Sequence, residues 1–277
     1  MNPLAIEALS VFGLPPVEFV DLAGDLGCRY ITVFLRNFAV LPLGYPQFSL
    51  KDDSRLRADL LAAMDLRGVS ISLGDGFLVL PDADMRSFSG DLDLMAELGV
   101  PRINVVSLDP DFDRTVDQVG TLAELAAQRQ IETVVEPVPG LTIADLPTAL
   151  AVLQHVSRPD VRLVIDTMHL VRSGSGAHDL ATIPPGQIGY AQLCDTTVAP
   201  QTDNYAEEAM FERMVPGEGE LPLREILAAL PADVVIGLEV PQRSLALAGV
   251  GPAERLRPCV EATQGLLQRW ISGPATA

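Results

Sequence analysis

The sequence predicts an α/β fold in which eight parallel strands and their helices close into a single (βα)8 barrel. Short β-branched and apolar runs alternate with amphipathic stretches along the whole chain, a pattern typical of a parallel α/β sheet. The length of 277 residues is close to the ~250 residues typical of such a barrel. No shift in composition divides residues 1–277, so we expect one domain, although length alone also allows two small ones.

Eight strands are expected where runs of Val, Ile and Leu end in polar or turn-forming residues. In chain order they are Leu9–Phe12, Tyr30–Leu35, Val69–Leu73, Arg102–Leu108, Ile131–Glu136, Arg162–Asp166, Ile188–Leu193 and Val234–Val240. A doubly wound open sheet is the alternative. The first strand of such a sheet should lead into a glycine-rich turn. Residues 11–16 contain a single glycine, Gly13, so the closed barrel is favoured.

Amphipathic stretches between these strands predict the helices, and Gly27 and Gly99 mark two helix ends. The expected helices are Pro16–Leu26, Asp53–Leu66, Asp84–Leu98, Arg114–Arg129, Ile143–His155, Ala177–Ile183, Pro222–Leu230 and Ala253–Trp270. Two long segments without periodicity, residues 36–50 and 196–220, each follow a strand. We expect them to form walls or lids of a pocket.

Charge and hydropathy exclude several classes of partner. The formal net charge is -18, with 37 acidic and 19 basic residues, whereas a protein that binds nucleic acid needs a basic face. No run approaches the ~20 apolar residues of a membrane span, and residues 1–13 lack the pattern of an export signal. We therefore expect a cytoplasmic protein whose partner is a small molecule, and the oligomeric state, monomer or homo-oligomer, stays open.

The scarce residue types narrow the chemistry further. Cys28, Cys194 and Cys259 are odd in number and widely spaced, which indicates buried reduced thiols and no disulfide framework. Lys51 is the only lysine, and it lies at an expected helix entry, away from the strand ends. Schiff-base aldolases and pyridoxal enzymes need an amine at the reaction centre, so both are improbable.

Four expected strands in the second half of the chain end in residues that can bind a metal. They are Glu136, Asp166, Gln192 and Glu239. Because the carboxyl ends of barrel strands open on one face, these side chains should converge there. Single acids at strand ends are commonly caps, but three carboxylates in a water-poor site repel one another unless a cation joins them. Such oxygen ligands favour a divalent ion, Mg²⁺ or Mn²⁺ before Co²⁺ or Zn²⁺.

Three further polar residues lie near these strand ends. His169 follows Asp166 by three residues and can bind a substrate hydroxyl or support a ligand, since imidazole both donates and accepts; a surface histidine is the plain alternative, as for His155 and His178. Arg213 precedes a turn rich in Gly and Pro, from which a guanidinium at the pocket rim could hold a substrate oxygen. Asp195 serves either to orient site groups or as a strand cap.

These residues lie in motifs that resemble the xylose-isomerase-like TIM barrels, specifically the sugar phosphate isomerase/epimerase group with its ketose 3-epimerases, hydroxypyruvate isomerases and inosose dehydratases. The motifs are VVEPVPG, VIDTMHL, QLCD, RMVPGEGELPL and GLEVP, and the resemblance covers nearly the whole chain. In that group the metal ligands are Glu, Asp, His and Glu. Their places fall on Glu136, Asp166, Gln192 and Glu239, so Gln192 departs from the pattern.

The resemblance implies a metal-dependent isomerase or epimerase that acts on a sugar or another polyhydroxy carbonyl compound. His169 and Arg213 would contact substrate oxygens, and Glu136 and Glu239 would face each other across the substrate carbon. A metal that chelates a carbonyl and its neighbouring hydroxyl acidifies the C–H between them and stabilises an enediolate, and two carboxylates then move the proton. A lyase or dehydratase using the same first step is one alternative. A non-catalytic barrel that only binds a ligand is the other.

Overall fold

The computed structural model describes residues 3–38 and 40–271 of the chain. Eight strands pair in parallel in sequence order, and the last pairs with the first, so the sheet closes into a barrel. The strands are β1 Leu4–Ile6, β2 Tyr30–Phe34, β3 Ser70–Val79, β4 Arg102–Ser107, β5 Glu132–Val135, β6 Val161–Asp166, β7 Ile188–Leu193 and β8 Ile236–Leu238. The predicted (βα)8 TIM barrel is confirmed.

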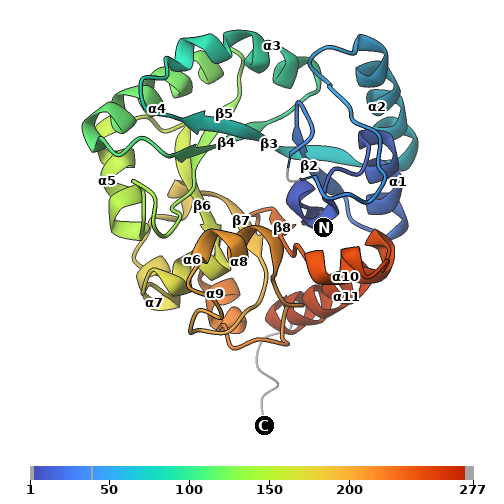
Figure 1. Ribbon diagram of the computed structural model, residues 1–277. Coiled ribbons are helices and arrows are strands. Elements are labelled where there is room, and N and C mark those ends of the chain that lie inside the picture. Colours follow the sequence, from blue (N-terminus) through green and yellow to red (C-terminus); the bar gives the residue numbers. More distant parts are fainter. Residues whose placement is uncertain (1–2, 39, 272–277) are drawn as a thin grey trace.

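Helices surround the strands, and the chain passes around this ring in sequence order from blue to red (Figure 1). The α-helices are α1 Pro16–Asp25, α2 Ser54–Arg67, α3 Ser89–Glu97, α4 Phe112–Ala127, α5 Leu146–Val156, α6 Thr167–Arg172, α7 Ala177–Leu180, α8 Tyr205–Phe211, α9 Leu223–Ala229, α10 Arg243–Leu247 and α11 Pro252–Ile271. The 3-10 helices are η1 Ala8–Val11, η2 Met85–Phe88 and η3 Pro185–Gln187. Within the described ranges, no helix has the length and apolar character to cross a membrane.

Aspartate side chains start several of these helices. Asp53, Asp111 and Asp145 each precede a helix and accept a hydrogen bond from the backbone N–H three residues later. Such caps satisfy one of the N–H groups that a helix start leaves without an intrahelical partner. Asp166 caps α6 in the same way, by accepting from the His169 N–H at 2.8 Å. This cap fixes the short turn that brings His169 beside the end of β6.

The first strand is the main correction to the sequence prediction. The expected strand Leu9–Phe12 is wrong, because these residues form η1 and its left-handed end, and β1 lies earlier, at Leu4–Ile6. Leu9, Val11 and Phe12 are buried, so their apolar character marks packing without an extended backbone. The expected helix Asp84–Leu98 divides into η2 and α3, while α6, α8 and α10 were not expected from the sequence.

The buried core consists of one large cluster and two small ones. Most buried apolar side chains lie in one cluster to which both the strands and the surrounding helices contribute. A second, smaller cluster comes from strand residues alone: Leu73, Val134, Val164 and Tyr190. The Tyr190 hydroxyl on β7 lies 3.1 Å from the Ser72 hydroxyl on β3 and donates to Glu7 Oε1 after β1 at 2.7 Å. These three elements are not neighbours in the sheet, so their hydrogen bonds cross the interior of the barrel.

Candidate active site

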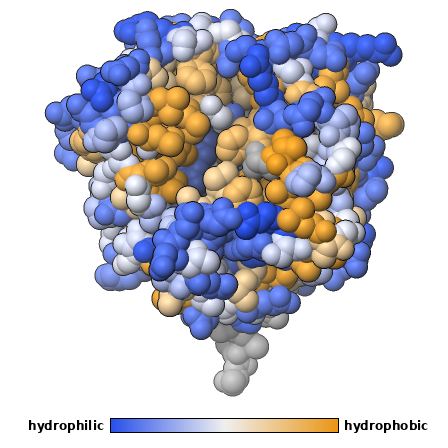
Figure 2. All heavy atoms as spheres, viewed as in Figure 1, coloured by the Kyte–Doolittle hydropathy of each residue, from blue (hydrophilic) through white to orange (hydrophobic). Residues whose placement is uncertain are grey.

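A cavity of about 320 Å³ lies at the carboxyl ends of the strands. It corresponds to the central hollow in Figure 2, where hydrophobic residues border a polar interior. Five of the six predicted site residues line it: Glu136, His169, Gln192, Arg213 and Glu239. The sixth, Asp166, has a fully buried side chain that contacts Arg213 and His169. Phe38 and Tyr205 also line the cavity, which confirms that both long loops form its walls.

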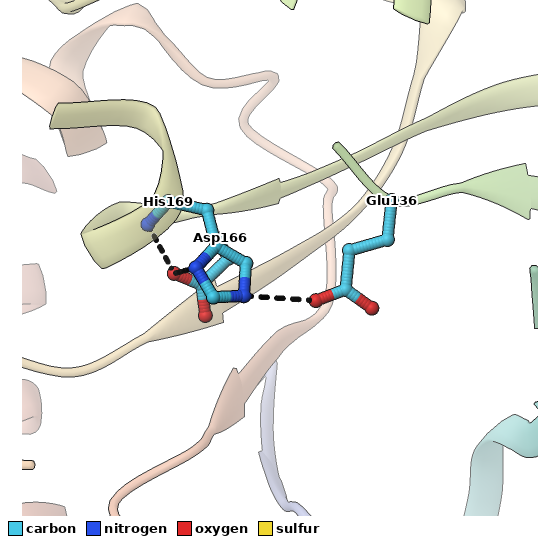
Figure 3. A group of neighbouring side chains, drawn as sticks. All are labelled: Glu136, Asp166 and His169. Atoms are coloured by element: carbon cyan, nitrogen blue, oxygen red, sulfur yellow. Dashed lines mark hydrogen bonds and ion pairs between the residues drawn. The ribbon is translucent and has the colours of Figure 1, made fainter. Parts of the chain in front are cut away.

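Glu136, Asp166 and His169 form a compact group (Figure 3). One possible ligand atom from each lies within 4.8 Å of the others, and all three residues are buried. His169 lies between the two acids, with Nε2 3.5 Å from Glu136 Oε1 and Nδ1 3.8 Å from Asp166 Oδ1. Its Nδ1 also pairs with the Tyr205 hydroxyl at 2.5 Å. Nε2 is therefore the ring nitrogen left to meet a ligand, on the side of Glu136.

Arg213 joins two of the predicted ligands. Its Nη1 lies 2.5 Å from Asp166 Oδ2, its Nη2 lies 3.0 Å from Glu239 Oε2, and its Nε donates to the Ala209 carbonyl. Burial alone would raise the pKa of Asp166, but the charge of Arg213 holds it at about 2. The sequence placed Arg213 at the pocket rim. The structure instead places its guanidinium at the floor, 4% exposed, between two carboxylates.

Gln192 is on β7, between the strands β6 and β8 that lead to Asp166 and Glu239. It pairs in register with Asp166 on β6 and with Gly237 on β8. Its Nε2 donates to Glu239 Oε1 across 3.4 Å, while its Oε1 is buried and has no hydrogen-bond partner. A buried acceptor without a partner is costly unless a ligand approaches it. A cation at the floor would satisfy this oxygen.

Glu7, Asp75 and Asn104 are site residues that the sequence analysis missed. All three line the cavity, and Asn104 donates from Nδ2 to Glu136 Oε2. Glu7 was missed because the first strand was placed too late, so Glu7 was not seen to follow β1. Asp75 and Asn104 lie inside long strands, where no strand-end signal points to them. The apolar runs around them indicated only burial.

The pKa values show how crowded the negative charges are. Burial and the nearby Glu136 carboxylate raise the pKa of Asp75 to about 7, although hydrogen bonds from Asn104 and Thr32 lower it. Burial and Asp75 raise the pKa of Glu7 well above its usual range. Burial also raises the pKa of Glu239, against the opposing effect of Arg213. Within the described residues, five carboxyl groups at the floor face one guanidinium, an excess that a bound cation would relieve.

The donor set therefore fits a divalent cation. Glu136, Asp166 and His169 are close enough to share one ion, and Gln192 offers an oxygen with no partner. The expected set of Glu136, Asp166, Gln192 and Glu239 stays a prediction. The geometry adds His169 to the residues within reach, whereas Glu239 pairs with Arg213 and Gln192.

Asp195 organises the loop that carries Arg213. Its carboxylate accepts from the N–H groups of Thr196, Gly217 and Leu221, at 2.9, 2.8 and 3.1 Å. Its backbone also bridges to Met214. Of the two roles considered for Asp195, this is the cap, and by holding residues 214–221 it fixes the chain next to Arg213.

Gly237 leaves room for Glu7 at the floor. A Cβ atom at position 237 would collide with Glu7 Oε1 and lie 2.8 Å from the Tyr190 hydroxyl. The pair formed by Glu7 and Tyr190 therefore occupies space that any other residue at position 237 would fill.

Solved structures share this fold at low sequence identity. The IolI protein with a bound zinc atom has a TM-score of 0.79 and 19% identity, covering 99% of this chain and 100% of that one. D-allulose 3-epimerase from Methylomonas sp. has a TM-score of 0.69 and 17% identity, covering 95% and 97%. The probable 3-DHS dehydratase AsbF from Bacillus anthracis has a TM-score of 0.71 and 15% identity, covering 94% and 98%.

A search among curated proteins finds no match to this sequence. Residues 20–262 do match a family described as xylose isomerase-like TIM barrel, in agreement with the closed barrel and with the motifs at its strand ends. The chain belongs to the xylose isomerase-like TIM barrel family.

Proposed function

We propose that the protein is an enzyme that moves a proton at a carbon next to a carbonyl group, and so isomerises or epimerises a small sugar-like hydroxy-carbonyl compound. One observation carries the proposal. Glu136 directly follows β5 and Glu239 directly follows β8, and both are buried and line one cavity. Two carboxylates around one substrate carbon allow one to remove a proton and the other to return it.

The residues next to these carboxylates are placed to support proton transfer. Asn104 holds one Glu136 oxygen, and Arg213 holds one Glu239 oxygen, so each carboxylate has a fixed direction. The Arg213 guanidinium also places positive charge at the floor, where it would stabilise an oxygen that becomes negative as the proton leaves. His169 Nε2 would bind a substrate oxygen beside Glu136.

A divalent ion, Mn²⁺ or Mg²⁺ before Co²⁺ or Zn²⁺, is part of the proposal. The residues that would hold it are Glu136, Asp166, Gln192 and Glu239, with His169 within reach of the same place. When bound, such an ion polarises a carbonyl and makes the adjacent C–H more acidic. The IolI protein, which shares this fold, has a bound zinc atom, and this supports the proposal that the protein binds a metal.

Elimination is the second candidate reaction, favoured by the structural similarity to the probable 3-DHS dehydratase. It begins with the same removal of a proton, and a leaving group on the next carbon would then depart. The same two carboxylates serve both reactions, because the second can protonate either a carbon or a leaving group.

Solvent-deuterium exchange tests the proposal. Keto-sugars and cyclic polyol-ketones incubated in D2O with the Mn²⁺-loaded protein should gain one deuterium on isomerisation or epimerisation, and should lose the mass of water on elimination. Glu136→Gln and Glu239→Gln should each slow exchange by roughly 100-fold or more. Glu132→Gln is the matched control, because Glu132 begins β5, the strand that Glu136 follows, and should leave the rate unchanged. Wild-type exchange rates in both site variants, with metal still bound, would contradict the proposal.

A further inference from the structure

We propose that the substrate carries a ring-sized apolar group beside its hydroxy-carbonyl end, in place of the row of hydroxyls of a free sugar. The inference rests on the proposed function, because it assigns the apolar part of the same cavity to the same substrate. It is carried by six residues that we call the apolar wall: Leu9, Phe34, Phe38, Val106, Leu108 and Val138.

Along single stretches of chain, a polar residue of the floor is followed by a residue of the apolar wall. Glu7 lines the floor after β1, and Leu9, two residues later, lines the cavity as well. After β5, Glu136 and Val138 repeat this order. In both places the carboxylate comes first, and the apolar side chain follows as the chain continues beyond the strand end.

β4 and the residue that follows it show the same order over three residues. Asn104, Val106 and Leu108 are two residues apart, so extended backbone points them to the same side, and all three line the cavity. Asn104 is 6% exposed and bonded to Glu136, whereas Leu108 is 44% exposed. The lining of the cavity therefore changes from polar at depth to apolar near the surface along this one stretch of chain. A ligand bound along this stretch meets the Asn104 amide at its inner end and apolar side chains farther out.

The outer part of the wall is aromatic. Phe34 and Phe38 stack with their ring centroids 4.5 Å apart and their planes at 22°. Phe38 is 40% exposed, so this pair stands at the opening of the cavity. Figure 2 shows hydrophobic residues on both sides of the hollow. A planar apolar ring can pack against such a surface over much of its area.

Two polar side chains that line the cavity together with the wall already have partners. The Tyr205 hydroxyl pairs with His169 Nδ1, and Arg213 pairs with Asp166 and Glu239. On α8, Ala209 and Met210 also line the cavity and contribute further apolar surface. Sugar hydroxyls against these surfaces would lose their water partners without replacement, whereas an apolar ring gains from leaving water.

Binding of three small hydroxyketones tests the inference. Hydroxyacetone, 2-hydroxyacetophenone and L-erythrulose share the CO–CH2OH end and differ in a methyl, a phenyl and a dihydroxyethyl group. Calorimetric titration into the Mn²⁺-loaded protein should give 2-hydroxyacetophenone a Kd roughly tenfold or more below that of hydroxyacetone. L-erythrulose should gain nothing over hydroxyacetone. Equal affinities for all three, or tightest binding of L-erythrulose, would overturn the inference.

Two leucines provide the matched variants. Leu108 and Leu80 each follow a barrel strand directly and are each 44% exposed, but Leu108 lines the cavity and Leu80 does not. Leu108→Asn should remove most of the preference for the phenyl compound, and Leu80→Asn should leave it intact. If the two variants behave alike, the phenyl group binds elsewhere and the inference is wrong.

Deuterium exchange into the same probes separates this inference from the proposed function. Exchange without any preference for the phenyl compound would remove the inference alone. A clear preference for the phenyl compound, with no exchange in any of the three probes, would remove the proposed function and leave an apolar ligand site.

Discussion

Arg213 and Asp166 form a buried ion pair across 47 positions of sequence, with Nη1 and Oδ2 2.5 Å apart and both side chains at most 2% exposed. The pair connects the end of β6 to the loop after β7. It therefore fixes the position of a loop relative to the barrel while it holds a negative charge at the floor.

Loss of Arg213 should destabilise the protein strongly. Arg213→Ala leaves Asp166 and Glu239 buried without their cationic partner, and such a loss typically costs about 3–5 kcal/mol. Urea unfolding of the metal-free protein measures this change in the free energy of unfolding. Arg86→Ala is the control, because Arg86 pairs with Asp84 on the surface and should change the free energy of unfolding by less than about 1 kcal/mol. Similar effects for both variants would mean that the buried pair contributes no more than an exposed one.

Removal of metal should lower the melting temperature. An ion that binds only the folded protein stabilises it by about 2.7 kcal/mol at a concentration 100 times its Kd. We expect EDTA-treated wild type to melt below the Mn²⁺-loaded protein. Asp166→Asn removes a charged ligand and should abolish most of that difference. Persistence of the full Mn²⁺ effect in Asp166→Asn would place the ion elsewhere.

Gln192→His should tighten the binding of Mn²⁺, Co²⁺ and Zn²⁺, with a smaller effect on Mg²⁺, because imidazole is a stronger donor than an amide oxygen for these ions. Titration calorimetry with Mn²⁺ and Mg²⁺ measures the shift. Gln242→His is a matched control: Gln242 is also buried and also has an Oε1 without a partner, but it does not line the cavity. Unchanged metal preference in Gln192→His would show that residue 192 is not a ligand.

Asp75 should make the metal-free protein less stable as pH rises. Its pKa is about 7 in the folded chain, above the ordinary value of 3.8, so the folded state keeps a proton that the unfolded chain loses. The resulting stability is complete below the ordinary pKa and is lost as pH rises toward 7. Asp75→Asn should melt a few degrees higher than wild type at pH 8 in EDTA and show a flatter profile from pH 5 to 8. Asp233→Asn, on the surface, should follow wild type.

Gly219 should tolerate no side chain. A Cβ atom there would collide with Asp195 Oδ1 and lie 2.5 Å from the Thr196 carbonyl oxygen. Gly219→Ala should therefore cost about 1–3 kcal/mol, as overpacking of a closely packed site does. It should also increase proteolysis of residues 214–221. Gly90→Ala, in α3 and with open space around it, should be neutral or slightly stabilising. Equal stability of the two variants would argue against the role given to Asp195.

The barrel and much of its floor could be predicted because the signals are local. Glu136, Asp166, Gln192 and Glu239 lie at or just beyond strand ends, and parallel strands bring such positions to one face. Glu7 could not be found, since a strand of three residues gives too short a pattern and the apolar residues of η1 gave a stronger one. The partners of Arg213 depend on how the long segment after β7 returns over the barrel, and no periodicity encodes that path.

The space shared by Glu7 and Gly237 has an evolutionary consequence. These positions are 230 residues apart in the chain, yet the volume that one side chain fills is the volume that the other must leave empty. Their substitution histories should therefore be linked. Relatives with a long residue at position 7 should keep glycine at 237, and those with a small residue at position 7 are free to carry alanine or serine there. Replacement of Gly237 while position 7 keeps a long side chain should be rare.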